Sequence, residues 1–199
     1  MSHITSAFTD VVHDSQLCFR RLLKAMSEPG TQVELDRCHG FGTMMPATSQ
    51  VLLAMADNST PLWLSQSFLQ DNAATRNIHF HTGASTNPTP DNASFAAIAL
   101  TDMPTIKLDE LVFNVGNEEY PDRSTTLVIE TDSLSSGQQF KLTGPGIKDE
   151  CCIQLGELSS EVKNTLLAQG EAFPLGLDLI FVSGEQVVAI PRSTSVEAM

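Results

Sequence analysis

Two histidines come nearest to a metal site in residue type and spacing. His79 and His81 are one residue apart, and residues 78–81 alternate apolar and polar as a strand does. On a strand both imidazole rings would face the same side and could begin a zinc site. Zinc usually takes three or four protein ligands, and the spacing nominates no third. We therefore favour histidines that line a polar face or anchor a loop, and we predict no metal.

A glycine-rich turn is the most distinctive local sequence. Residues 142–147 read Leu-Thr-Gly-Pro-Gly-Ile. Two glycines around a proline, directly after a strand, make a tight turn whose exposed N–H groups can hold an anion. Thr143, Gly144 and Gly146 are therefore candidate anion-binding or substrate-binding residues. The alternative is a turn that only ends the strand.

Arginine side chains offer a second way to bind an anion. Arg20 and Arg21 are consecutive on an expected helix, so they point in different directions and cannot form one clamp. Arg20 is kept as a candidate, with pairing to a surface carboxylate as the alternative. Ser27, just past the expected end of that helix, could bind a ligand or could cap the turn.

Asp178 opens an apolar strand, and burying an unpaired charge there would be costly. Arg192, which follows the last expected strand, is a candidate partner. The two residues predict either a structural salt bridge or part of a polar substrate site.

Several enzyme classes leave no trace in the sequence. It contains no G-x-x-x-x-G-K-[ST] phosphate loop, no G-x-G-x-x-G, no G-x-S-x-G elbow and no H-E-x-x-H helix. No lysine has a context that singles it out for imine chemistry. We therefore name no catalytic residue and predict no cofactor.

The elements that position these residues alternate between helix and strand at first, and paired strands dominate later. We expect helices at 15–26 (capped by Asp14), 49–56, 67–76, 108–112 and 161–169, and strands at 32–35, 61–64, 78–81, 95–100, 126–130, 140–143, 177–183 and 186–190. Strands 126–130 and 140–143 are expected to join across the turn at 135–137. This order favours an α/β fold with a mixed sheet flanked by helices.

Composition limits the function classes. A chain of 199 residues suits one domain, residues 1–199, and the best linker candidate, 83–92, is no longer than an ordinary loop. The 11 basic residues face 24 acidic ones, a net charge of −13, which argues against a nucleic-acid or anionic-membrane partner. With no secretion signal, no apolar run of about 20 residues and no C-x-x-C among the cysteines, we expect a cytoplasmic protein with reduced thiols.

Five strings together carry a resemblance to one family. They are residues 19–30, 56–64, 142–147, 173–180 and 189–194. In this order they resemble the PhnH family, subunits of the carbon–phosphorus lyase system of phosphonate-using bacteria. The likeness runs from about residue 8 to residue 197.

The resemblance implies a fold and a role. The fold would be a three-layer α/β sandwich similar to the large domain of pyridoxal-phosphate-dependent transferases, without the cofactor, and the protein would form homodimers. With PhnG, PhnI and PhnL, the subunit would support transfer of the ribose triphosphate of ATP to an alkylphosphonate, with loss of adenine. PhnJ is a further expected partner.

Three functional hypotheses follow. The first is a subunit of a transferase and lyase complex that is not catalytic alone. The second is an independent small-molecule-binding enzyme with a degenerate transferase-like cleft. The third is an assembly scaffold, for which substitution of Arg20 or Arg192 would leave activity intact if the complex still formed.

Overall fold

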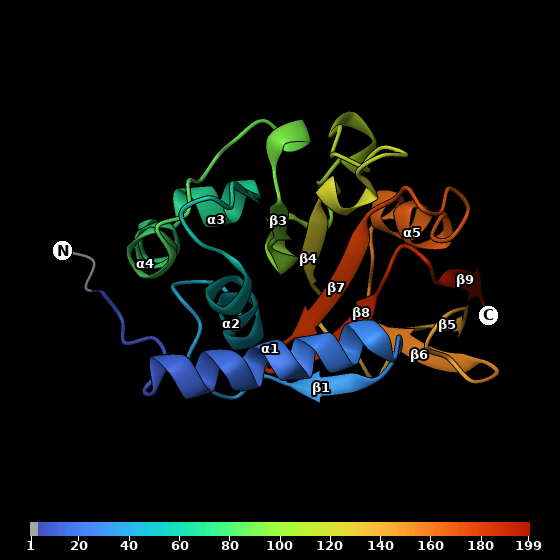
Figure 1. Ribbon diagram of the computed structural model, residues 1–199, viewed down its shortest axis with the longest axis horizontal. Coiled ribbons are helices and arrows are strands. Elements are labelled where there is room, and N and C mark those ends of the chain that lie inside the picture. The colour runs from blue at the N-terminus through green and yellow to red at the C-terminus, as the bar shows by residue number, and fades with distance from the viewer. Residues whose placement is uncertain (1–3) are drawn as a thin grey trace.

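The structure is a computed structural model, and it describes residues 4–199 (Figure 1). Its strands are β1 Gln32–Glu34, β2 Leu62–Leu64, β3 Phe95–Ile98, β4 Thr126–Glu130, β5 Gln138–Thr143, β6 Cys151–Leu155, β7 Asp178–Ser183, β8 Gln186–Ile190 and β9 Ser195–Ala198. Its α-helices are α1 Val11–Ser27, α2 Pro46–Met55, α3 Gln66–Gln70, α4 Asn72–Thr82 and α5 Ser160–Leu167. Short 3-10 helices occur at η1 Pro90–Asn92, η2 Leu100–Asp102, η3 Leu108–Glu110 and η4 Pro121–Arg123.

A mixed six-stranded sheet forms the centre, in the order β1-β8-β7-β4-β3-β2. Strands β2, β3, β4 and β7 are parallel, while β8 and β1 add antiparallel strands at one side. The predicted hairpin of β7 and β8 is confirmed, with Ser183 paired to Gln186. The α/β class with a mixed sheet is therefore confirmed.

Both faces of this sheet are buried, as parallel strands require. Alternate side chains of each strand point to opposite faces, so Val128 belongs to one apolar cluster and its neighbours Leu127 and Ile129 to the other. Helices α1 to α4 cover the first face. The second face is covered by α5 and a three-stranded sheet, which lie on the other side of the large sheet in Figure 1.

The three-stranded sheet, β6-β5-β9, differs from the expected pairing. The sequence pattern predicts no strand at residues 151–155 or 195–198 and joins residues 126–130 directly to 140–143. Instead β5 leaves the large sheet and pairs with β6 and β9, both antiparallel. Strands β6 and β9 are short and half exposed. Each gives only two or three apolar positions to the sequence pattern, which is too few to show the alternation of a strand.

The first helix begins earlier than its apolar pattern indicates. Its N-cap is Asp10, whose carboxylate accepts from the His13 N–H at 3.0 Å, while Asp14 accepts from the Asp10 N–H at 2.9 Å. The prediction of Asp14 as cap is wrong, because Val11 and Val12 are exposed and extend no apolar face. Phe19, on the same helix, is also exposed.

Residues 78–81 are helical, so their predicted strand is wrong. Asp71 caps α4 by accepting from the N–H groups of Ala73 and Ala74, and Gly83 ends the helix in the left-handed conformation. Ile78 is buried one turn after Ala74, whereas Phe80 is exposed. The alternation of apolar and polar residues over these four positions is typical of a strand, but the four positions belong to a longer helix.

Candidate functional site

Asp178 and Arg192 form a buried ion pair at the amino end of β7. The Arg192 guanidinium donates to Asp178 Oδ2 at 2.6 Å and to Oδ1 at 3.2 Å, and the Arg192 backbone N–H also donates to Oδ1, at 2.9 Å. A third guanidinium nitrogen donates to the carbonyl of Pro121. The predicted salt bridge is confirmed, and its donors and acceptors tie β7, the segment after β8 and the loop before β4 together.

The glycine-rich turn lies against the same C-terminal segment. Gly144 and Gly146 both have positive φ, +131° and +85°. A Cβ on Gly144 would lie 2.9 Å from the Ser193 carbonyl oxygen, and one on Gly146 would lie 2.1 Å from the Ser27 carbonyl oxygen. Backbone packing alone therefore requires glycine at both positions. Anion binding by this turn, including Thr143, stays a prediction.

Parts of three of the five strings that carry the resemblance thus meet in space. They are the end of α1, the turn after β5, and residues 193 and 194. Ser27 donates its hydroxyl to the Lys24 carbonyl at 3.1 Å, which is the capping role weighed for it. Arg20 is exposed and makes no hydrogen bond or ion pair with the described residues, and Arg21 pairs with Asp36 at 2.7 Å.

The two histidines do not share a face, because α4 separates them by about 200° around its axis. The His79 ring contacts the Ala84 carbonyl at 3.1 Å, and the His81 ring contacts the Thr5 carbonyl at 2.9 Å. Each therefore holds a loop or the N-terminal segment. Across residues 4–199, no group of three or more His, Cys, Asp or Glu side chains is placed to hold a metal.

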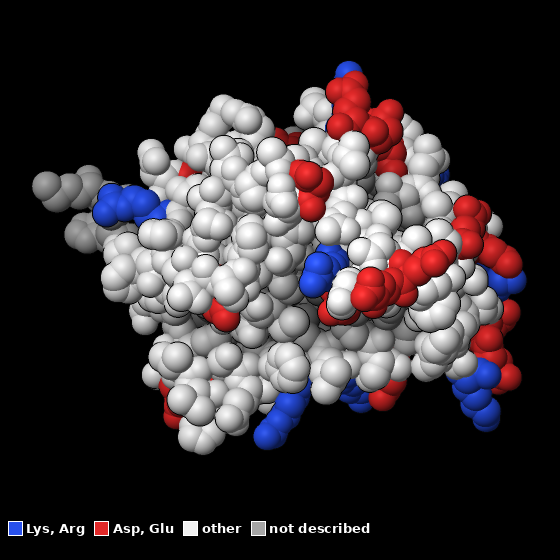
Figure 2. All heavy atoms as spheres, turned by 45° about the horizontal axis from the view of Figure 1, so that its top comes forward, with Lys and Arg blue, Asp and Glu red and all other residues white. Residues whose placement is uncertain are grey.

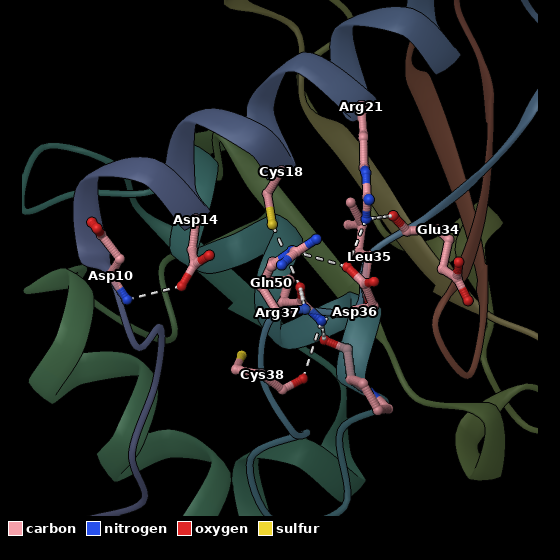
Figure 3. Close-up of polar contacts among 11 residues, drawn as sticks. Asp10, Asp14, Cys18, Arg21, Glu34, Leu35, Asp36, Arg37, Cys38 and Gln50 are labelled. Atoms are coloured by element: carbon pink, nitrogen blue, oxygen red, sulfur yellow. Dashed lines mark hydrogen bonds and ion pairs between the residues drawn. The ribbon is translucent and has the colours of Figure 1, made fainter.

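A second polar cluster surrounds Gln50, which is fully buried on α2 (Figure 3). Its amide donates to the carbonyls of Leu35 and Cys38, and its oxygen accepts from the Arg37 N–H at 2.7 Å and from the Cys18 thiol at 3.4 Å. Burial raises the pKa of the Cys18 thiol to about 11 and that of Cys38 to about 12. These thiols stay protonated and unreactive, so the cluster fastens α1 and α2 to residues 35–38.

Two cavities open at the other end of the sheet, where β2, β3 and β4 end. One, of about 460 Å³, is lined by Trp63, Ser65, Asn87 and Asp102 among others. The second, of about 430 Å³, reaches Glu130. They lie on either side of the first turn of α3, and we call them together the carboxyl-end cleft. Ligands of parallel α/β sheets bind beyond this end of the strands.

Glu130 is the buried charge of the cleft. It is 2% exposed at the last position of β4. Its Oε1 accepts from the Met45 N–H at 2.7 Å and the Thr48 hydroxyl at 2.8 Å, and its Oε2 accepts from the Leu100 N–H at 3.3 Å. Burial raises its pKa, and these donors only partly oppose that rise. A buried carboxyl with a raised pKa, facing a cavity, is a typical general acid or base.

A further carboxylate, Asp102, lines the cleft, and another, Asp71, lies outside it and holds Thr43, which lines it. Asp102 accepts from the Ser67 N–H at 2.8 Å and hydroxyl at 2.5 Å, and Thr101 donates to the Ser67 hydroxyl at 3.0 Å. Asp71 accepts from the Thr43 N–H at 2.6 Å. Burial alone would raise the pKa of Asp71. This hydrogen bond and those from the N–H groups at the start of α4 outweigh burial, so the pKa is lowered. The cleft is therefore a preorganised, acidic hydrogen-bonding surface.

The surface charge agrees with an acidic molecule. In Figure 2 acidic side chains gather mainly over the right-hand part of the face shown, and basic side chains stand singly among them or at the rim. Within residues 4–199 no helix is long and apolar enough to cross a membrane.

Comparison with known proteins relates this chain to one family. The family model described as "Bacterial phosphonate metabolism protein (PhnH)" matches residues 6–197. The chain belongs to the PhnH family. The α-D-ribose 1-methylphosphonate 5-triphosphate synthase subunit PhnH of Rhizobium meliloti (strain 1021) is 35% identical over 194 residues, which cover 97% of this chain and 95% of that protein. A candidate C–P lyase subunit protein, HtxG, of Stutzerimonas stutzeri is 33% identical over 90 residues, 45% of this chain and 46% of that one.

In this PhnH-family chain, the five strings that carry the resemblance contribute few of the residues that form the carboxyl-end cleft. Of the cleft residues named above, Trp63 alone lies within one of those strings. The sequence signal for Glu130 was weak: an acidic residue at the end of an apolar strand, Leu-Val-Ile-Glu. The same reasoning that found Asp178, an acid next to buried positions, would have found it.

Proposed function

We propose that this chain is the PhnH subunit of the synthase that makes α-D-ribose 1-methylphosphonate 5-triphosphate in phosphonate catabolism. The observation that carries the proposal is the 35% identity to the Rhizobium meliloti subunit across nearly the full length of both chains. The chain would act in the cytoplasm inside a C–P lyase complex, with PhnG, PhnI, PhnJ and PhnL as partners, and would not be catalytic alone.

The fold supports a single domain over residues 1–199, because both apolar clusters pack against the same six-stranded sheet. Likeness to the large domain of pyridoxal-phosphate-dependent transferases belongs to this proposal, and no cofactor is assigned. The substrate-contact roles of Arg20, Ser27, Thr143, Gly144, Gly146, Asp178 and Arg192 likewise stay predictions.

Deletion and co-purification test the proposal. A strain that lacks the gene should fail to grow on methylphosphonate as sole phosphorus source and should grow normally on phosphate. The tagged chain should bring down the other lyase subunits from cells grown on methylphosphonate. Normal growth of the deletion strain on methylphosphonate, or a tagged chain that is active and unaccompanied, would contradict the subunit role.

We also propose a homodimer formed through one face of α1. Phe19 and Leu23 are 46% and 57% exposed, and together with Met26, Met55 and Ile180 they line an apolar groove of about 110 Å³. The same patch thus supplies both projecting apolar side chains and the hollow that can receive them, which is what a two-fold interface between identical copies needs. Unpaired Arg20 flanks it and is available to an acidic residue of the second copy.

Light scattering after size exclusion tests the interface. Leu23→Asp should convert the dimer to a monomer, because an unpaired charge would have to be buried in the contact. Phe80→Asp is the matched control, since Phe80 is 65% exposed on α4 outside this patch. A monomeric wild-type chain, or equal effects of both substitutions, would refute the proposed face.

The rival function, an independent small-molecule enzyme, draws support from Glu130 in the carboxyl-end cleft. Glu130→Gln keeps the shape of the side chain and removes its proton transfer. The rival predicts that the isolated wild-type chain turns over a substrate and that this variant does not. A complex that assembles with the variant but loses turnover would instead show that the chain supplies a catalytic group within the complex. Full turnover would leave the chain a supporting role in the complex.

A further inference from the structure

The cavity of about 460 Å³ beside Trp63 is a hollow that the proposed subunit role does not use. Its volume lies within the range of small-molecule sites, roughly 300–1,000 Å³. One wall is apolar and includes Trp63, Leu69 and Ile106. Trp63 is the single tryptophan of the chain, and its indole is fixed edge-on against Phe113, with ring centroids 5.4 Å apart. The cavity therefore has a rigid aromatic wall.

Asn87 is exposed at the polar side of this cavity, in the left-handed conformation that asparagine adopts more readily than most other residues. Its φ of +72° makes it the one non-glycine residue of the described chain in the left-handed region. Its backbone N–H donates to the Leu62 carbonyl at 3.0 Å, which fixes its position, while its side-chain amide makes no hydrogen bond with the described residues. The amide is therefore exposed at the cavity and can form hydrogen bonds with a ligand.

The charges of the cavity select against anions. Asp102 and Glu110 line it, and among the described residues Lys107 is the only basic one that lines it, with its ammonium bound to Glu110 at 2.7 Å. The Asp102 carboxylate is held in place by Ser67. A phosphate or carboxylate group would meet net negative charge here, whereas a neutral ligand with N–H donors would find acceptors.

We infer that this cavity binds a neutral planar nitrogen heterocycle of the kind found in nucleosides. An aromatic wall stacks such a ring, an interaction worth about 1–3 kcal/mol per base. The Asn87 amide offers a donor and an acceptor side by side, which is the arrangement that pairs with the edge of a purine. The Asp102 carboxylate accepts from an exocyclic amine. This inference rests on the proposed function in one respect, because the reaction proposed for the complex releases adenine from ATP, and it is tested on the isolated chain.

The single tryptophan gives a direct readout, because a nitrogen-15-labelled chain shows one indole N–H signal. Adenine and adenosine should each shift this signal saturably, and inorganic tripolyphosphate should not. Asn87→Gly removes the amide while glycine accepts the positive φ, so the fold is kept. We expect this variant, and Asn87→Asp, to weaken adenosine binding about tenfold through the lost amide hydrogen bonds.

Asn58→Gly is the control, since Asn58 is exposed in a turn and lies outside the residues that line the cavity. It should bind adenosine as the wild type does. An unmoved indole signal at millimolar adenosine, equal affinity of the Asn87 variants and the wild type, or a stronger response to tripolyphosphate than to adenosine would each overturn the inference. Co-purification with the lyase subunits would be unaffected by any of these results, so the two proposals fail separately.

Discussion

The two ends of the central sheet differ in the surroundings of their buried carboxylates. At the amino end of β7, Asp178 and Arg192 satisfy each other, and the glycine turn fills the space beside residues 193–195. At the carboxyl ends of β2, β3 and β4, Glu130 and Asp102 accept hydrogen bonds from fixed donors and still face open cavities. The amino end is closed by its own residues, and the carboxyl end leaves room for a ligand.

This difference separates structural polar residues from residues that can act on a ligand. A buried pair with every donor and acceptor used contributes to the uniqueness and stability of the fold. A buried carboxylate with neutral partners and an adjacent cavity retains capacity for a further contact. We therefore expect substitutions at the amino end to change the free energy of unfolding strongly, and substitutions in the cleft to change binding and pH dependence.

The largest expected effect is at the amino end. Asp178→Ala leaves the Arg192 guanidinium, with a side chain 16% exposed, buried without its carboxylate. We expect a loss of about 3–5 kcal/mol in the free energy of unfolding, measured by urea denaturation. Glu197→Ala is the control, because the Lys141–Glu197 pair is more exposed and should contribute at most about 1 kcal/mol. Similar losses in both variants would mean that the buried pair has no special role.

A smaller effect is expected in the glycine turn. Gly146→Ala combines a φ of +85° with a Cβ 2.1 Å from a backbone oxygen, so the backbone itself must move. We expect a loss of about 2–4 kcal/mol. Gly184→Ala has a φ of +61° with nothing within 4 Å of the added Cβ, so only the conformational cost of about 1 kcal/mol applies. If thermal unfolding gives equal losses, the close approach is not what requires glycine at 146.

Much of the fold could be predicted from the sequence, because long apolar patterns report burial directly. The strands Thr126–Glu130, Asp178–Ser183 and Gln186–Ile190 each contain a continuous apolar run, and the sequence places all three to within one residue. The small sheet was missed for two reasons. Strand β6 follows β5 directly but buries too few of its residues to show a strand pattern, and β9 pairs with β5 from the far end of the chain. Pairing of this kind depends on the whole fold and leaves no local pattern.

The candidate site was harder to predict for a related reason. The pairing of Asp178 with Arg192 was predicted because an acid entering an apolar strand needs a partner nearby. The cleft gathers Trp63, Asn87, Asp102 and Glu130 from four separate segments, and none is unusual in its own segment. A left-handed asparagine, or the openness of a cavity beside a carboxylate, is visible only once the strands have been placed side by side.

The smallest effect, and the sharpest test of the carboxyl end, is the pH dependence given by Glu130. Because burial raises its pKa in the folded protein, the folded state keeps this proton at pH values where the unfolded chain has released it. The protein is therefore most stabilised below the unfolded pKa, and that stability falls as the pH rises through the folded pKa. Glu130→Gln cannot titrate. We expect it to lose about 1 kcal/mol near pH 4, since an amide satisfies the donors of Met45 and Leu100 less well, and to lose less or even gain at pH 7. Urea denaturation of both proteins across this pH range measures the difference. If the difference in free energy of unfolding between the two proteins were the same at every pH, Glu130 would ionise as easily as an exposed carboxylate. The carboxyl-end cleft would then resemble the closed amino end in its electrostatics.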